Sequence, residues 1–158
     1  MKKIKLRPVT VILLALTLLW CAVIFAFSSR SADESTADSD GVTKLIATFV
    51  DELFGVEVNF SSFVIRKAAH MTEFAVLGVL ASLTLASAVG WLNKRCLLFC
   101  LAFCVLIASL DELSQFLSPG RSPQVRDVLI DACGAAVGIF IVKLANRIYL
   151  KNQLQERG

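Results

Sequence analysis

The chain has 158 residues, of which 56% are hydrophobic and 18% are charged, and its net charge at pH 7 is +3. The length fits a single domain, and the small positive charge, spread over the chain, counts against a nucleic-acid partner. A mean hydropathy of +0.71, with apolar residues in long runs, excludes an ordinary soluble domain. The composition therefore indicates an integral membrane protein.

The first predicted membrane helix covers about residues 9–27. It is uncharged and follows a basic segment that carries Lys2, Lys3, Lys5 and Arg7. Its length is close to the ~20 residues that a helix needs to cross a bilayer. A cleaved signal peptide is the alternative, but its apolar core is usually only about 7–15 residues long. We therefore expect an uncleaved membrane helix.

Residues 28–40 are rich in serine and acidic residues and are predicted to form a solvated loop. Over about residues 41–54, apolar residues recur at the spacing of a single helical stripe. Asp40 is the expected N-cap of this helix and Gly55 its expected C-terminal stop. Because the helix is too short to span, we expect it to lie on the membrane or on other helices, as a packing lid.

Three further membrane helices are predicted, over about residues 62–91, 96–117 and 127–145, and a polar tail follows the last of them. The first of the three is longer than a bilayer is thick, so its first turns can lie at the interface. The whole chain, 1–158, is thus predicted to be one all-α domain. It is an integral membrane four-helix bundle with an extra amphipathic interfacial helix in the first outer loop.

The distribution of charges predicts the orientation of the helices in the membrane. Lysine and arginine are concentrated near the two termini and in the short turn at residues 93–95, whereas every acidic residue except Glu156 falls on the opposite side. Basic residues favour the cytoplasmic side. We therefore expect a multi-pass protein of the cell membrane with cytoplasmic N- and C-termini, and with segments 33–57 and 119–126 facing outward.

Two clusters of polar residues interrupt the apolar runs. They comprise Arg66, Lys67, His70 and Glu73 in one, and Asp111, Glu112, Gln115, Arg121, Arg126, Asp127 and Asp131 in the other. A charge at a membrane-helix centre costs about 2.5–3.5 kcal/mol on insertion scales, so such residues usually pair inside the bundle and mark function. We expect His70 or Glu73 to lie within side-chain reach of the carboxylates of the second cluster. Their pocket is expected to open outward beneath segment 119–126.

Helical periodicity places the acids of the last membrane helix on its small-residue face. Asp127, Asp131, Ala135 and Gly138 align along one side, with Gly134 beside them. Glycines four residues apart allow two membrane helices to approach closely. The coincidence of charge and close packing predicts that these acids point into the bundle.

Three chemistries suit these residues: metal binding by His70 and the carboxylates, acid–base catalysis, and recognition of an anionic head group by the basic side chains. No HExxH or comparable spacing supports the metal site, so the sequence identifies neither a metal nor a cofactor. The plainest alternative is a set of buried ion pairs that only fixes the register of the helices.

The polar clusters resemble the signature of the VanZ-like family of bacterial membrane proteins. The similarity rests on Arg66-Lys67-Ala68-Ala69-His70-Met71-Thr72-Glu73-Phe74 with Leu77-Gly78, on Asp111-Glu112-Leu113-Ser114-Gln115-Phe116, on Pro119-Gly120-Arg121, on Arg126-Asp127, Asp131 and Gly134, and on Phe27-Ser28-Ser29 after the first helix. It covers about residues 20–142. One departure is Asp131, where we expect asparagine in many relatives, and its added charge counts against schemes that need a neutral amide there.

The resemblance implies a protein of the bacterial cell envelope, since the family is named for a protein associated with teicoplanin resistance in Gram-positive bacteria. We expect it to bind an anionic lipid or lipid-linked cell-wall precursor at the outer leaflet and to contribute to glycopeptide antibiotic resistance. The expected ligand-binding residues are Arg66, Lys67, Gln115, Arg121, Arg126 and Asp127. The alternatives are a purely structural membrane partner and an intramembrane hydrolase or transferase acting on a lipid-linked substrate. In that enzyme the catalytic residues are His70, Glu73, Asp111, Glu112 and Asp131.

Overall fold

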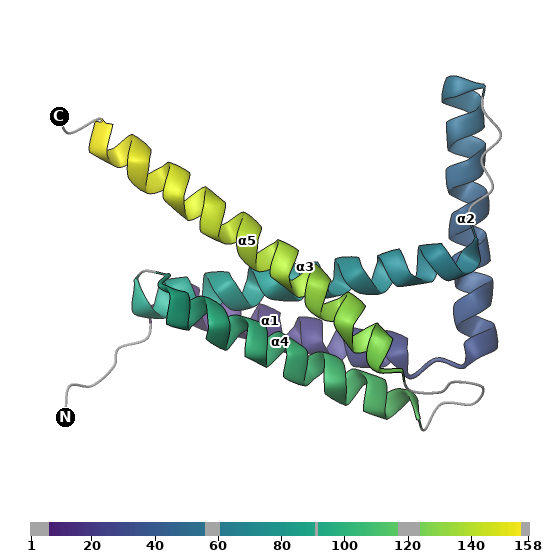
Figure 1. Cartoon of the computed structure of the whole chain (residues 1–158), viewed down its shortest axis with the longest axis horizontal. Coiled ribbons are helices and arrows are strands. Elements are labelled where there is room, and N and C mark those ends of the chain that lie inside the picture. The colour runs from purple at the N-terminus through teal and green to yellow at the C-terminus, as the bar shows by residue number, and fades with distance from the viewer. Residues whose placement is uncertain (1–6, 56–60, 91, 117–123, 156–158) are drawn as a thin grey trace.

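A computed structural model describes residues 7–55, 61–90, 92–116 and 124–155, and in these ranges the chain forms helices and no strands (Figure 1). The helices are α1 (Pro8–Ser28), α2 (Ala32–Phe54), α3 (Ser62–Val89), α4 (Lys94–Gln115) and α5 (Val125–Gln155). Four stretches are long and apolar enough to cross a membrane: α1, α3, α4 and Val125–Ile148 of α5. The predicted fold class is therefore confirmed.

The ends of α3 and α4 follow from capping by residues in the short turn between them. Gly90 ends α3 in the left-handed conformation, with φ of 80° and its N–H bonded to the carbonyl of Ala86. The side chain of Asn93 accepts a hydrogen bond of 2.8 Å from the N–H of Cys96 and so starts α4 at Lys94. These caps place both ends within a few residues of the predicted bounds.

The predicted loop at residues 28–40 is wrong, because α2 already begins at Ala32. Ser31, and not Asp40, is the N-cap: its hydroxyl accepts the N–H of Glu34 at 3.3 Å, and the Glu34 carboxylate accepts the N–H of Ser31 at 3.1 Å. This reciprocal capping box starts a helix in a sequence that is otherwise polar. The stop at Gly55 is confirmed, with φ of 64°.

The predicted end of the last helix at residue 145 is too early, because α5 continues through the polar tail to Gln155. It also begins slightly earlier than predicted, at Val125. Residues 146–155 are mostly good helix formers and include neither glycine nor proline, so nothing in this stretch of sequence ends the helix.

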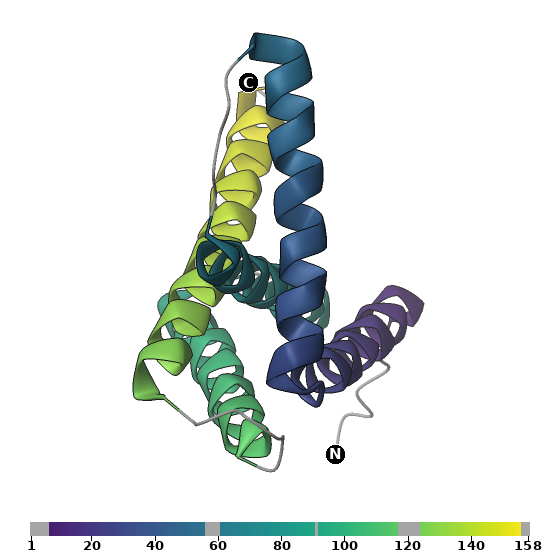
Figure 2. The same cartoon turned by 90° about the vertical axis from the view of Figure 1, so that its right-hand side faces the viewer.

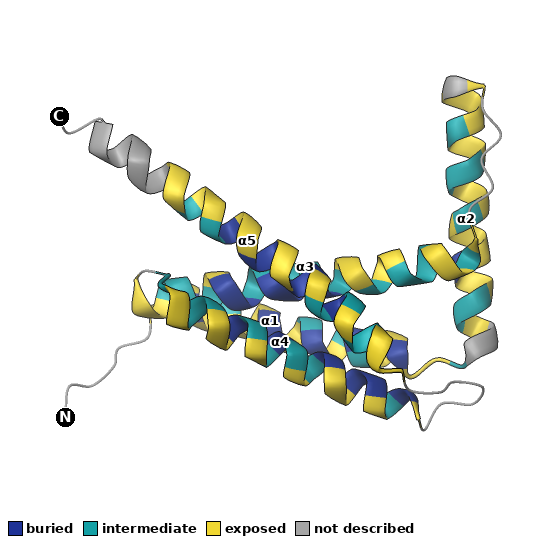
Figure 3. Ribbon diagram, in the orientation of Figure 1, coloured by how far each residue is buried: buried dark blue, intermediate teal, exposed yellow. Residues whose placement is uncertain are grey.

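Helix α3 is the centre of the bundle and contacts each of the other four helices, most extensively α5. In Figure 1, α1, α3 and α4 run side by side, α5 crosses them, and α2 stands across one end. Figure 2 shows the same arrangement from that end, with α2 upright in front of the bundle. The buried residues, among them Ile24, Phe74, Leu77 and Cys104, lie where the membrane helices meet (Figure 3).

Glycines bring the backbones of α3 and α5 into direct contact. A β-carbon added at Gly134 would overlap the backbone of Met71, and one at Gly138 would overlap the backbone of Ala75. Gly78 on α3 faces the backbone of Ala135 in the same way. The close approach predicted from the spacing of Gly134 and Gly138 is therefore confirmed.

Helix α2 carries an apolar stripe that the rest of the bundle does not cover. Leu45, Phe49 and Leu53 are 71%, 61% and 59% exposed, and in the described part of the chain α2 packs against α3 alone. A helix that lies across the end of a membrane bundle with its apolar side uncovered suits the membrane interface.

A methyl group at Gly134 is expected to destabilise the bundle. In Gly134→Ala the β-carbon meets a backbone and not a flexible side chain, so α3 and α5 must separate, which we expect to cost about 1–3 kcal/mol. Gly41→Ala is the matched control, because nothing lies within 4 Å of a β-carbon there. Thermal unfolding in detergent should show a lower midpoint for Gly134→Ala alone, and equal midpoints would contradict the close packing.

Candidate functional site

The two predicted clusters meet at the end of the bundle that α2 crosses. His70 of α3, Asp111 of α4 and Asp131 of α5 each offer one donor atom, and these atoms all lie within 4.8 Å of one another. The exposed fractions of Asp111 and Asp131 are 0% and 2%, whereas His70 is half-buried. The predicted convergence of His70 with the acids of the second cluster is therefore confirmed. The roles of these residues stay predictions.

Asp111 is held by two polar neighbours in the interior. The hydroxyl of Ser28, the last residue of α1, donates to its Oδ2 at 2.7 Å. The side-chain amide of Gln115, one turn further along α4, donates to Ser28 Oγ at 3.0 Å and to Asp111 Oδ2 at 3.3 Å. All three residues are buried, so this network fixes α1 against α4 at the level of the acids. Ser28 was part of the family signature but not of the predicted site.

His70 and Glu73 face each other one turn apart on α3. The distance from His70 Nδ1 to Glu73 Oε2 is 3.7 Å, and both side chains are mostly buried. The indole N–H of Trp20 donates to the backbone carbonyl of Glu73 at 2.9 Å, which fixes α1 against this turn. Glu73 is therefore positioned to orient the imidazole ring.

A small polar cavity of about 10 Å³ lies between α3, α4 and α5. Its lining residues are Lys67, His70, Glu112, Gln115, Asp127, Ile130 and Asp131. Lys67 forms an ion pair with Asp127, and Glu112 Oε1 accepts the backbone N–H of Gln124 at 2.5 Å. This volume is about the minimum that holds one water molecule.

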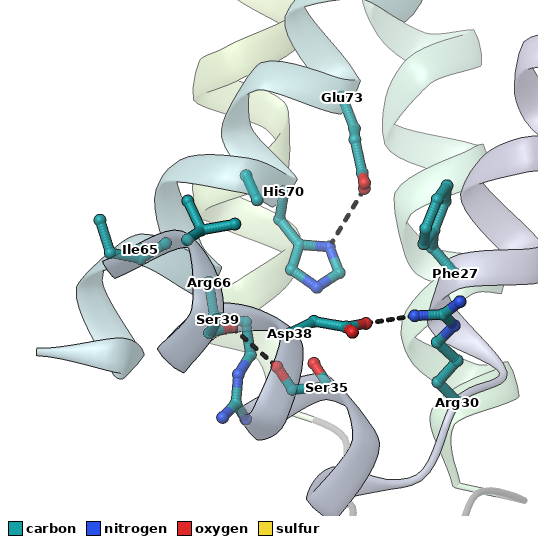
Figure 4. A pocket seen from close by; sticks show the side chains of 11 residues that line it. Phe27, Arg30, Ser35, Asp38, Ser39, Ile65, Arg66, His70 and Glu73 are labelled. Atoms are coloured by element: carbon teal, nitrogen blue, oxygen red, sulfur yellow. Dashed lines mark hydrogen bonds and ion pairs between the residues drawn. The ribbon is translucent and has the colours of Figure 1, made fainter. Parts of the chain in front are cut away.

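A larger cavity of about 210 Å³ opens between α1, α2 and α3 (Figure 4). Its lining includes Arg30 at the end of α1, Asp38 of α2, and Arg66, His70 and Glu73 of α3. Figure 4 shows the Asp38 side chain reaching below the His70 ring to pair with Arg30. His70 thus lines both cavities.

Arg66 is the basic residue of α3 in the larger cavity. Its Nη2 donates to Thr36 Oγ1 of α2 at 2.7 Å. Its Nε is buried and has no hydrogen-bond partner among the described residues. A guanidinium with an unused donor can still bind an anion.

Sequence reasoning missed four polar residues that line this cavity, Arg30 between α1 and α2 and Ser35, Asp38 and Ser39 of α2. They were assigned to a solvated loop, although Ser31 and Glu34 at S-x-x-E spacing signal a helix start. That signal would have placed residues 35, 38 and 39 on one helix beside α3.

Of the predicted ligand-binding residues, Arg126 is not brought into the site and Arg121 is not described. Arg121 and most of segment 119–126, beneath which the pocket was expected, lie outside the described residues. Arg126 is exposed and lines neither of the two polar cavities. The larger cavity instead lies against α2, because the helix that was mistaken for a loop covers this side of α3.

The two polar cavities differ in their charged groups. The larger one presents two arginines and an imidazole, which are groups that bind phosphate or carboxylate, beside the carboxylates of Asp38 and Glu73. The smaller one is bordered by three carboxylates and one lysine, and Asp111 adjoins His70 and Asp131 just outside its lining. Carboxylates and imidazole are proton carriers and metal ligands.

A family model described as VanZ/LLP1 matches residues 13–146, a range that includes both polar clusters and nearly all of the four membrane helices. No curated protein and no solved structure matches the chain.

Loss of the Ser28 hydroxyl is expected to destabilise the protein. Ser28→Ala removes the hydroxyl that donates to buried Asp111 and accepts from buried Gln115. The loss of these hydrogen bonds should lower the free energy of unfolding by about 1–3 kcal/mol. Ser29→Ala is the control, because Ser29 is exposed and its hydroxyl bonds to the carbonyl of Phe25 in its own helix. Its effect should stay within about 0.5 kcal/mol. Equal losses in thermal unfolding would show that the network does not hold α1 to α4.

Proposed function

The chain belongs to the VanZ/LLP1 family, and from this premise we propose that it binds an anionic head group at the outer face of the bacterial cell membrane. The ligand class is an anionic lipid or a lipid-linked cell-wall precursor, whose phosphate enters the larger cavity. The phenotype expected from the family resemblance is teicoplanin resistance, so deletion of the gene in a Gram-positive host should raise susceptibility.

The observation that carries this proposal is a cavity whose lining includes three basic side chains, those of Arg30, Arg66 and His70. A guanidinium presents its donors in a planar fork that matches phosphate oxygens. A volume of about 210 Å³ suits a head group rather than a whole lipid. The hydrocarbon tail would then remain in the bilayer.

The location of the cavity supports a lipid ligand. It lies between the membrane helices and α2, whose exposed apolar stripe suits the interface. Lys94 and Arg95 lie at the other end of α4, roughly 30 Å along its axis from Gln115. With basic residues on the cytoplasmic side, the cavity faces outward and both termini face the cytoplasm.

Replacement of Arg66 tests head-group binding. We expect Arg66→Gln to weaken the binding of phosphatidylglycerol, or of a prenyl phosphate, by about 10–100-fold, because a charge-assisted hydrogen bond contributes about 1.5–3 kcal/mol. Native mass spectrometry of the detergent-purified protein, titrated with each lipid, measures the loss. Arg126→Gln is the matched control and should bind like the wild type, since Arg126 lines neither polar cavity. Equal affinity of wild type and Arg66→Gln would overturn the proposal.

A second function, favoured by the convergence of His70 with buried carboxylates, is an intramembrane hydrolase or transferase acting on a lipid-linked substrate. A head group in the larger cavity would lie against His70, which could transfer a proton to or from it. Glu73, Asp111, Glu112 and Asp131 are the other catalytic candidates.

Turnover distinguishes the enzyme from the binding protein. If the site is catalytic, the purified protein releases phosphate from a prenyl diphosphate or head group from a phospholipid. The turnover rate of the double variant His70→Ala, Glu112→Gln should then be at least 100-fold lower than that of the wild type. Turnover that survives in the double variant would exclude these residues as catalysts. Absence of turnover in the wild type would leave binding as the function.

A further inference from the structure

We propose that His70, Asp111 and Asp131 form a binding site for one divalent transition-metal ion of the Zn²⁺ or Mn²⁺ class. Each residue comes from a different membrane helix and offers one donor atom to the same small volume. The site shares His70 with the head-group cavity but does not depend on head-group binding.

The separation of the donor atoms suits an ion after a small adjustment. Nitrogen and oxygen ligands lie about 2.0–2.2 Å from zinc, so ligands of one ion are roughly 3–3.5 Å apart. The three donor atoms lie within 4.8 Å of one another. Rotations of the side chains that move each donor by less than about 1 Å bring them onto one ion.

Asp131 supplies an independent indication of a ligand. Its exposed fraction is 2%, and its Oδ1 is buried without a hydrogen-bond partner among the described residues. An unpaired carboxylate oxygen in the interior is costly, and a cation at this position removes the cost. The ammonium group of Lys67, which lines the same small cavity, pairs with Asp127.

The surroundings resemble those of metal ligands in proteins. Histidine ligands usually direct their second ring nitrogen to a carboxylate, and Glu73 lies 3.7 Å from Nδ1 of His70. Ser28 and Gln115 bond to Oδ2 of Asp111 and fix the orientation of that carboxylate. The cavity of about 10 Å³ that borders His70 and Asp131 can hold a water ligand.

The donor set selects the class of metal. One imidazole nitrogen and two carboxylate oxygens are three protein ligands, which leave an open position as in catalytic zinc sites. Magnesium and calcium prefer oxygen ligands alone, so the histidine counts against them. Because His70 lines both polar cavities, an ion bound to it would lie next to the larger cavity.

Metal analysis of the purified chain tests the site. The protein is treated with EDTA in detergent, dialysed against Zn²⁺ or Mn²⁺, and measured by inductively coupled plasma mass spectrometry and by thermal unfolding. We expect about one ion per chain and a higher unfolding midpoint with the ion, as ligand linkage requires. In Asp131→Asn and His70→Gln the affinity should fall at least 100-fold, and the rise in midpoint should vanish.

Asp51→Asn is the matched control, because Asp51 is an exposed carboxylate on α2 and is outside the donor set. It should retain one ion per chain. Wild-type protein that takes up neither Zn²⁺ nor Mn²⁺ would overturn the proposal, as would an affinity that falls equally in Asp51→Asn. Because the readout is metal content, a negative result here leaves the test of head-group binding unaffected.

Discussion

The structure depends on the burial of Asp111 and Asp131, two carboxylates on different helices, inside a bundle whose outer surface is apolar. Each would be costly in such an interior if it were isolated, so other polar groups must surround it. Ser28, Gln115 and His70 come from α1, α4 and α3 to do so. Because the two carboxylates need polar partners from other helices, they fix how the membrane helices meet at this end of the molecule.

Close packing makes this burial feasible. Because Gly134 and Gly138 let α5 touch the backbone of α3, Asp131 lies at the depth of His70 and not at the lipid surface. The same contact leaves the end of α3 to be covered by α2, where the larger cavity opens. One feature of the sequence, a run of small residues beside acids, thus determines both the tight interface and the depth of Asp131.

The sequence predicted the membrane helices well, because uncharged runs of bilayer length have few other interpretations. It also predicted that His70 would approach the acids, since pairing of buried charges is nearly obligatory. The prediction failed for residues 28–40. Their serine-rich, acidic composition was taken to indicate a loop, although Ser31 caps a helix. Arg30 and Asp38 were missed for that reason, and Ser28 was not counted as a site residue although it belongs to the motif that resembles the family signature.

The claim that the two polar clusters form one site is tested most directly by disulfide cross-linking in membranes. In a background with the five native cysteines replaced by serine or alanine, His70→Cys combined with Asp131→Cys should cross-link on mild oxidation. His70→Cys combined with Lys143→Cys should not, because residue 143 lies about 18 Å further along α5. Cross-linking of the first pair alone is the predicted result. Absence of that cross-link, or equal cross-linking of both pairs, would contradict the account.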